Sequence, residues 1–276
     1  MKNLKLTLVA ILIASISFGQ NLDSIQQKVN NYISQAKLDS AKTYIHSNID
    51  KLDLRKDKNE LNYQLVKVLF IQSSYDEALQ QAFNSLDHVD DQEQRVKFNF
   101  MIGAIYSAIS DYSKSVDYFK LVVQESENAS LTVKSHLLLS DLHFTLKDTL
   151  NGKKSLSDAY RITSASKLDS KINDHVAMQY NYYSENYELC KQLNFKTIKD
   201  STSFISSKSF AYSMIGDCLI KQDSLLKSTS FYDEHLKLTF ETKDPEQIKD
   251  AANKLIDVYE KLGNQEKANS YHKKQH

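Results

Sequence analysis

The chain is poor in the residues that interrupt helices. Its 276 residues include one proline and five glycines. Because proline breaks helices and glycine weakens them, this scarcity allows long helices joined by short turns and leaves little room for a β-rich fold. The chain also lacks an excess of one charge, since 35 Lys and Arg balance 35 Asp and Glu. It therefore lacks the basic surface expected of a protein that binds nucleic acid or an acidic membrane.

The sequence also lacks the common motifs of catalysis and metal binding. It contains no glycine-rich phosphate loop, no HExxH, no CxxC and no nucleophile elbow. His136 and His143 are seven residues apart, but no carboxylate accompanies them at matching spacing, so we interpret them as surface or packing residues. We therefore expect no enzyme activity, no catalytic residues, no bound metal and no cofactor.

The N-terminal residues 1–19 have the organisation of a secretory signal peptide. A short basic region is followed by an apolar run over residues 6–16, and Ser17 and Gly19 then place small residues before Gln20. The run is shorter than the ~20 residues of a membrane-spanning helix, although an uncleaved anchor is the alternative. No cysteine lies at the junction for lipid attachment. The sequence predicts cleavage before Gln20, no membrane insertion afterwards, and an exported protein that is periplasmic or secreted.

What the chain does have is a repeat. Small residues recur at steps of 37, 37, 37, 38, 38 and 40 residues, at Ala41, Ala78, Ser115, Gly152, Cys190, Ser228 and Ala268. A fixed period of this length is typical of stacked helical repeats, in which a small residue is needed where two helices approach most closely. In the third copy, Phe98 and Ile105 precede a polar turn at residues 110–112, and Val116 and Phe119 follow it at helical spacing. Each copy is thus predicted to be a helix–turn–helix unit.

The repeats resemble the tetratricopeptide repeat (TPR) family. Ile102-Gly103, Tyr106, Ser115 and Phe119 match that family's pattern of large, small and aromatic residues, although the period is nearer 37 than ~34 and the family's proline is missing. The resemblance implies an all-α fold, a right-handed α-solenoid of about seven repeats covering residues 20–276. The approximate units are 22–55, 59–92, 96–129, 133–166, 171–204, 209–242 and 249–276, of which the fourth and fifth are degenerate.

In the family that the chain resembles, the first helix of each repeat lines a concave groove. Carrying the groove positions onto this sequence gives Tyr63, Lys67, Phe70, Phe100, Ser107, Leu137, Asp141, Phe144, His175, Gln179, Tyr182, Tyr183, Phe210 and Asp217. Such a surface suits an extended peptide or a partner protein. The alternative is that several of these aromatic residues pack between repeats instead.

Two functions are implied by this resemblance. The first is an exported protein–protein interaction scaffold that binds a peptide or partner protein in its groove. The alternative is a sensory or regulatory module that is related to TPR-containing signalling proteins but lacks their output domain. Neither the partner nor the oligomeric state can be read from the sequence.

Cys190 and Cys218 are the chain's two cysteines, and they fall in adjacent repeats. An oxidising compartment would permit a disulfide between them. The alternative is that both are small buried hydrophobic residues, which free cysteines often are.

A further pattern is Asp followed by Ser or Thr and then an aliphatic residue. It looks like the acceptor motif of an O-glycosylation system of some Gram-negative bacteria, which implies modification at Ser24, Ser40, Thr149 and Ser224. The alternative is that these residues cap helices, because Asp, Ser and Thr are favoured at helix N-termini.

Overall fold

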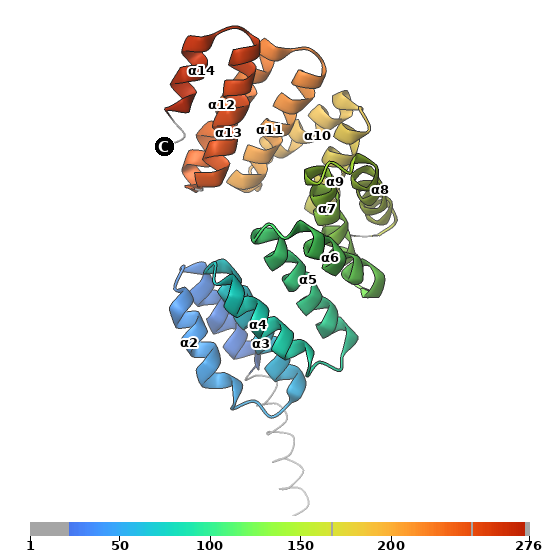
Figure 1. The fold of residues 1–276 in the computed structure, drawn as a ribbon, viewed down its shortest axis with the longest axis vertical. Coiled ribbons are helices and arrows are strands. Elements are labelled where there is room, and N and C mark those ends of the chain that lie inside the picture. Colours follow the sequence, from blue (N-terminus) through green and yellow to red (C-terminus); the bar gives the residue numbers. More distant parts are fainter. Residues whose placement is uncertain (1–21, 167, 244, 274–276) are drawn as a thin grey trace, which may run out of the picture. The chain divides into compact units, whose positions relative to one another are not determined.

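The computed structural model describes residues 22–166, 168–243 and 245–273, and all regular secondary structure in these ranges is α-helical (Figure 1). In chain order, a helix over residues 22–34 is followed by α2 (Leu38–Ile49), α3 (Arg55–Ile71), α4 (Tyr75–Leu86), α5 (Gln92–Ala108), α6 (Tyr112–Glu125), α7 (Ala129–Thr145), α8 (Thr149–Ala165), α9 (Ser170–Tyr183), α10 (Tyr187–Lys199), α11 (Ile205–Lys221), α12 (Leu225–Thr242), α13 (Pro245–Lys261) and α14 (Gln265–His272). The chain divides into two compact units, Met1–Ser155 and Leu156–His276.

The helices form consecutive pairs, which confirms the predicted all-α fold of helix–turn–helix repeats. The two helices of a pair are joined by three residues, as in residues 72–74, 109–111 and 146–148. The middle residue of every such connection has a positive φ: Ala36, Ser73, Ser110, Lys147, Glu185, Asp223 and Gly263, with φ between 54° and 70°. These positions follow the same steps of 37 to 40 residues as the small residues in the sequence.

Each left-handed residue closes the first helix of its pair with the same two hydrogen bonds. In the α7–α8 connection, the Lys147 amide donates to the Phe144 carbonyl at 3.0 Å, and the Asp148 amide donates to the His143 carbonyl at 2.7 Å. The same pattern recurs at the other six connections. It is the Schellman motif, which satisfies the last carbonyls of a helix and reverses the chain. All seven repeats therefore share the same turn conformation, although Gly263 is the only glycine among the seven left-handed residues.

The repeated small residues lie where the two helices of a pair meet. All seven are buried, in the first turns of the second helices. In the third repeat the Ser115 hydroxyl donates to the Gly103 carbonyl of the facing helix at 2.8 Å. In the fourth, a Cβ on Gly152 would come within 2.8 Å of the Phe144 ring. Larger side chains would force the helices apart, so the register read from the sequence is confirmed.

Each unit has its own core. In the first unit the core runs from Ile25 through α3 to Ile105, with Leu61, Leu69 and Ile102 fully buried. In the second unit Leu255 lies in a cluster of buried residues from α12, α13 and α14. Burial of these apolar side chains supplies the main stabilising free energy of such repeats.

Polar side chains link successive repeats within each unit. Lys42 of α2 pairs with Glu77 of α4 at 2.6 Å, and Lys97 of α5 pairs with Glu60 of α3 at 3.4 Å. These pairs are partly exposed, and each is expected to add only about 0–1 kcal/mol to the free energy of unfolding.

The first helices begin earlier than the predicted units. The unit predicted at 59–92 starts with α3 at Arg55, and the unit predicted at 209–242 starts with α11 at Ile205. The first turn of α3 is polar (Arg-Lys-Asp-Lys), so the apolar periodicity used for the prediction begins only after it.

The predicted signal peptide, residues 1–19, lies outside the described residues. Among the helices that the structure describes, none is both long enough and apolar enough to cross a membrane.

The left-handed turns generate a prediction about stability. Lys147 is exposed and has a φ of 62°, a conformation that costs an L-residue roughly 1–2 kcal/mol. Lys147→Gly should therefore raise the free energy of unfolding by about 0.5–1 kcal/mol, after allowance for the greater entropy of glycine in the unfolded chain. Denaturant unfolding monitored by circular dichroism measures this change.

Lys153→Gly is the matched control, because Lys153 is an exposed lysine in the helical interior of α8. It should lower the free energy of unfolding by about 1 kcal/mol. Equal destabilisation by the two substitutions would show that the turn is not left-handed.

Candidate functional site

The second unit contains a hollow of about 450 Å³ between the first helices of two successive repeats. It lies at the N-terminal halves of α9 and α11, next to the end of α10 and the connection that follows it. Its lining residues are Ser170, Lys171, Asp174, His175, Met178, Lys196, Thr197, Asp200, Thr202, Ser203, Ser206, Ser207 and Phe210. Its volume falls in the range of ligand-binding clefts, about 300–1,000 Å³.

The floor of this hollow is apolar. Met178 is 4% exposed, and the half-buried ring of Phe210 lies 4.9 Å from the His175 imidazole. Burial lowers the pKa of His175, because desolvation disfavours the charged imidazolium. The imidazole is therefore neutral at pH 7 and adds a polar ring, but no charge, to an otherwise apolar floor.

The rim carries both signs of charge. Lys196 pairs with Asp174 at 2.9 Å, and the Lys171 ammonium lies 5.2 Å from the centre of the Phe204 ring. The Asp200 carboxylate accepts the backbone N–H of Thr202 at 2.8 Å, and this bond lowers the pKa of Asp200. The rim thus offers exposed ammonium and carboxylate groups around a floor suited to an apolar side chain.

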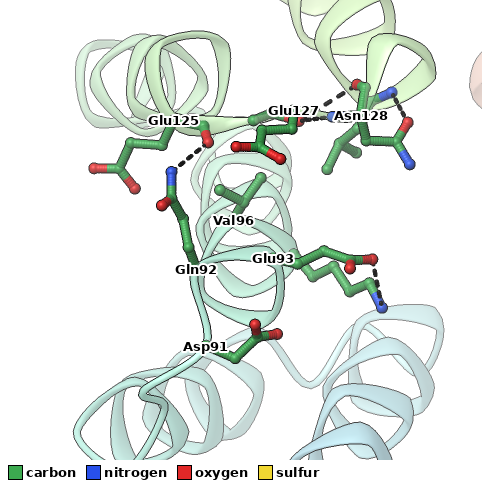
Figure 2. Close-up of a pocket in the computed structure, with 10 residues that line it drawn as sticks. Asp91, Gln92, Glu93, Val96, Glu125, Glu127 and Asn128 are labelled. Atoms are coloured by element: carbon green, nitrogen blue, oxygen red, sulfur yellow. Dashed lines mark hydrogen bonds and ion pairs between the residues drawn. The ribbon is translucent and has the colours of Figure 1, made fainter.

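The first unit has a hollow of about 430 Å³ at the corresponding place in its repeats, between the start of α5 and the α6–α7 connection (Figure 2). Gln92 Nε2 donates to the Glu125 carbonyl at 2.8 Å and ties the two sides together. Glu93 pairs with Lys97 at 3.6 Å, and Asp91 accepts the Gln94 amide as a helix cap.

This second hollow is acidic. It is lined by four acidic residues, Asp91, Glu93, Glu125 and Glu127, with Lys97 as the one cationic residue of the lining. Glu127 is exposed, and Glu125 Oε2 is buried without a hydrogen-bond partner. The two hollows occupy equivalent places in the repeat but have different chemistry. Neither could be predicted from the sequence, because helix ends and connections form them and these vary between repeats.

The predicted groove residues of the first unit lie on first helices, as expected, but several pack against neighbouring helices. The Tyr63 ring lies 5.8 Å from the buried ring of Phe98, and the Phe100 ring lies 5.5 Å from that of Phe119. Phe144 faces Gly152 of the following helix. Phe70 and Ser107, at the equivalent position of the second and third repeats, are likewise half-buried.

Lys67, Leu137 and Asp141 also lie on first helices. The Lys67 ammonium lies 5.1 Å from the centre of the Tyr63 ring, and burial lowers its pKa. Leu137 is half-buried and Asp141 is exposed. Desolvation nevertheless raises the pKa of Asp141 to about 6.

In the second unit the predicted groove residues separate into two groups. Phe210 and His175 line the hollow described above. Gln179 is 8% exposed, and its Nε2 lies 3.4 Å from His175 Nε2. The half-buried rings of Tyr182 and Tyr183 lie 5.0 Å apart.

Asp217 belongs to an internal network instead. Its carboxylate accepts from the Tyr232 hydroxyl at 2.7 Å and from the Lys254 ammonium at 2.8 Å. It thereby links α11, α12 and α13, and its oxygens are occupied within the unit.

The residues of the proposed glycosylation motif lie at or near the starts of helices. Ser24, Ser40 and Thr149 are exposed in the first turns of their helices, and Ser224 is half-buried just before α12. Of the acids that precede them, Asp148 caps a helix by accepting the Asn151 amide at 3.2 Å. Neither α2 nor α12 has a side-chain cap. Helix capping therefore does not account for all four motifs, and modification of the four hydroxyls stays a prediction.

The two histidines assigned to the surface or to packing are both buried on α7. His143 Nδ1 lies 3.4 Å from an Asp148 oxygen. Throughout the described ranges, no three His, Cys, Asp or Glu side chains are grouped so that they could hold a metal ion.

No family model and no curated protein matches this chain. Several solved structures match its fold. A tetratricopeptide repeat protein from Parabacteroides merdae is 12% identical in sequence and has a TM-score of 0.54. The match covers 93% of this chain and 99% of that protein. The apo form of the quorum sensor NprR from B. thuringiensis is 12% identical and has a TM-score of 0.64. The match covers 95% of this chain and 76% of NprR.

A Rap protein complexed with competence and sporulation factor is also similar, at 12% identity and a TM-score of 0.55. The match covers 86% of this chain and 74% of the Rap protein. At these identities the likeness concerns the fold alone. Together with the seven helix pairs of the described residues, it establishes that the chain has the fold of a TPR-like α-solenoid.

Proposed function

We propose that this chain is an interaction scaffold that binds an extended peptide segment of a partner protein along the first helices of its repeats. The observation that carries the proposal is the hollow between α9 and α11, where Met178, His175 and Phe210 form an apolar floor inside a charged rim. A peptide side chain would fill the floor, and the rim would orient the peptide backbone and its polar groups.

The acidic hollow of the first unit also supports a binding role, but it would prefer a different kind of partner side chain. Its carboxylates would attract a basic residue of a partner, whereas the hollow of the second unit suits an apolar one. Stacked repeats commonly bind extended partners on such continuous surfaces. The Rap protein with a similar fold is complexed with competence and sporulation factor, which supports a binding role for this fold. The role that we propose is non-catalytic.

A sensory or regulatory role is the second candidate. It is favoured by the likeness to NprR, which is described as a quorum sensor. Both roles begin with binding of a partner to the repeats. They differ in the consequence of binding, because a sensor must bind its ligand with different affinity in two conformations. Hydrogen exchange of helices remote from the bound peptide, slowed or accelerated on binding, would favour the sensor.

The scaffold proposal predicts that the hollow of the second unit controls peptide affinity. Peptides would be selected from a random-sequence phage library on the wild-type protein, and their dissociation constants measured by fluorescence polarisation. Phe210→Ala should weaken binding by about tenfold or more, because a central aromatic anchor is worth at least ~1.4 kcal/mol. Ser206→Trp should weaken it similarly by filling the hollow, since Ser206 is exposed on its rim.

Phe240→Ala is the matched control. Phe240 is 46% exposed on α12 and does not line the hollow, so its removal should leave affinity unchanged. Circular dichroism would verify that all three variants keep their helicity. Undiminished binding by both Phe210→Ala and Ser206→Trp would place the peptide elsewhere and refute the proposed site.

We also propose that the protein is exported to the periplasm or secreted. The support is the basic and apolar pattern of residues 1–19 with small residues before Gln20. The full chain, expressed in a Gram-negative host, should yield an exported form whose intact mass corresponds to a start at or near Gln20. A chain that keeps residues 1–19 and stays with the cytoplasmic fraction would contradict this.

A further inference from the structure

The chain's two cysteines face each other between successive repeats. Cys190 lies on α10, the second helix of the fifth repeat, and Cys218 lies on α11, the first helix of the sixth. Their Sγ atoms are 3.2 Å apart. Both side chains are fully buried, and the structure holds them as free thiols. A disulfide bond of ~2.05 Å would require the sulfurs to move together by only about 1 Å.

The surroundings make the two thiols unequal. The Cys218 thiol donates a hydrogen bond to Cys190 Sγ, and Asn194 Nδ2 lies 3.5 Å from the same sulfur as a second donor. The bond from Cys218 lowers the pKa of Cys190 and raises that of Cys218. In the packed protein Cys190 is therefore the more acidic of the two thiols.

We propose that Cys190 and Cys218 form an intramolecular disulfide that covalently joins the fifth and sixth repeats. The oxidant is a disulfide, either of a small thiol such as glutathione or of a thiol–disulfide exchange protein. The Cys190 thiolate attacks one sulfur of the oxidant and expels the other as a thiolate, which gives a mixed disulfide. The Cys218 thiolate then attacks Cys190 Sγ and expels the second thiolate.

In total the two protein thiols lose two electrons and two protons, and the oxidant becomes two thiols. Because both sulfurs are fully buried, the exchange occurs before α10 and α11 pack or when they separate locally. The bond that results is then shielded from reductants by the same packing.

The bond would form directly behind the proposed binding surface. Cys190 and Cys218 form a buried cluster with Met214, and Tyr182 and Phe210 pack against this cluster. Phe210 also lines the hollow between α9 and α11. The disulfide would therefore fix α10 against α11 and hold the wall of that hollow. This inference goes beyond the proposed function, because it requires no partner and is tested without one.

The test is to refold the full chain in glutathione buffers that range from reducing to oxidising, stop the exchange with acid, unfold the protein in denaturant, and count the free thiols by alkylation and mass. With excess oxidised glutathione the chain should take up no alkyl group, and a peptide map should show the Cys190 and Cys218 peptides joined. With excess dithiothreitol the chain should take up two alkyl groups, one on each cysteine. Closing a loop of 28 residues should raise the Tm of the oxidised protein by roughly 5–10 °C.

Cys190→Ala and Cys218→Ala are the matched controls, because each removes one of the chain's two cysteines. Neither should show a redox-dependent Tm or an internally joined peptide. Two free thiols in the wild-type protein under oxidising conditions would overturn the proposal. So would glutathione adducts, or bridges between different chains, in place of the internal bond.

Discussion

The close approach of the two helices within each repeat is the constraint on which the rest of the structure depends. A three-residue connection with a left-handed central residue reverses the chain, and a small buried residue comes five positions later. The turn brings the second helix back along the first, and the small side chain lets the two come together. Because the same distance separates turn and small residue in all seven copies, each pair presents nearly the same faces to its neighbours.

This regularity explains where variation is tolerated. The helix faces between repeats must be apolar and must fit, as Leu61, Ile102 and Leu255 do in their respective cores. The connections between repeats are under less constraint. The chain places carboxylates at one such junction, near Glu127, and Phe210 with hydroxyls and lysines at another. Specific recognition can therefore differ from repeat to repeat while the backbone design stays the same.

The sequence was sufficient to predict the fold, because close helix packing requires small residues and these therefore recur at a regular interval in the sequence. It located connections such as residues 110–112, but it was not sufficient to predict that they are left-handed. Most of the seven left-handed residues, such as Lys147 and Glu185, carry no sequence signal for that conformation, whereas Gly263 and, more weakly, Asp223 do. The start of α3 was predicted late for a similar reason, since its polar first turn adds nothing to an apolar pattern.

The candidate site was predicted only in part. Sequence reasoning could place Tyr63, Phe100 and Phe144 on first helices, but an aromatic ring there can either face a partner or fill the space between helices. The structure shows all three against neighbouring residues of the protein. Phe210 was placed correctly on a first helix, yet its hollow depends on Lys196 and Thr202 from the preceding helix end and connection. Such proximity is a property of the stacked repeats and cannot be read from one repeat alone.

The most direct test of this account is a large side chain at one of the repeated small positions. Ala78 is fully buried at the meeting point of α3 and α4, whereas Gln80, two residues later on α4, is exposed. Ala78→Phe should lower the free energy of unfolding by about 1–3 kcal/mol or more through overpacking. Gln80→Phe should change it by no more than about 0.5 kcal/mol. Equal unfolding free energies of these two variants would contradict the claim that the small residues set the approach of the helices.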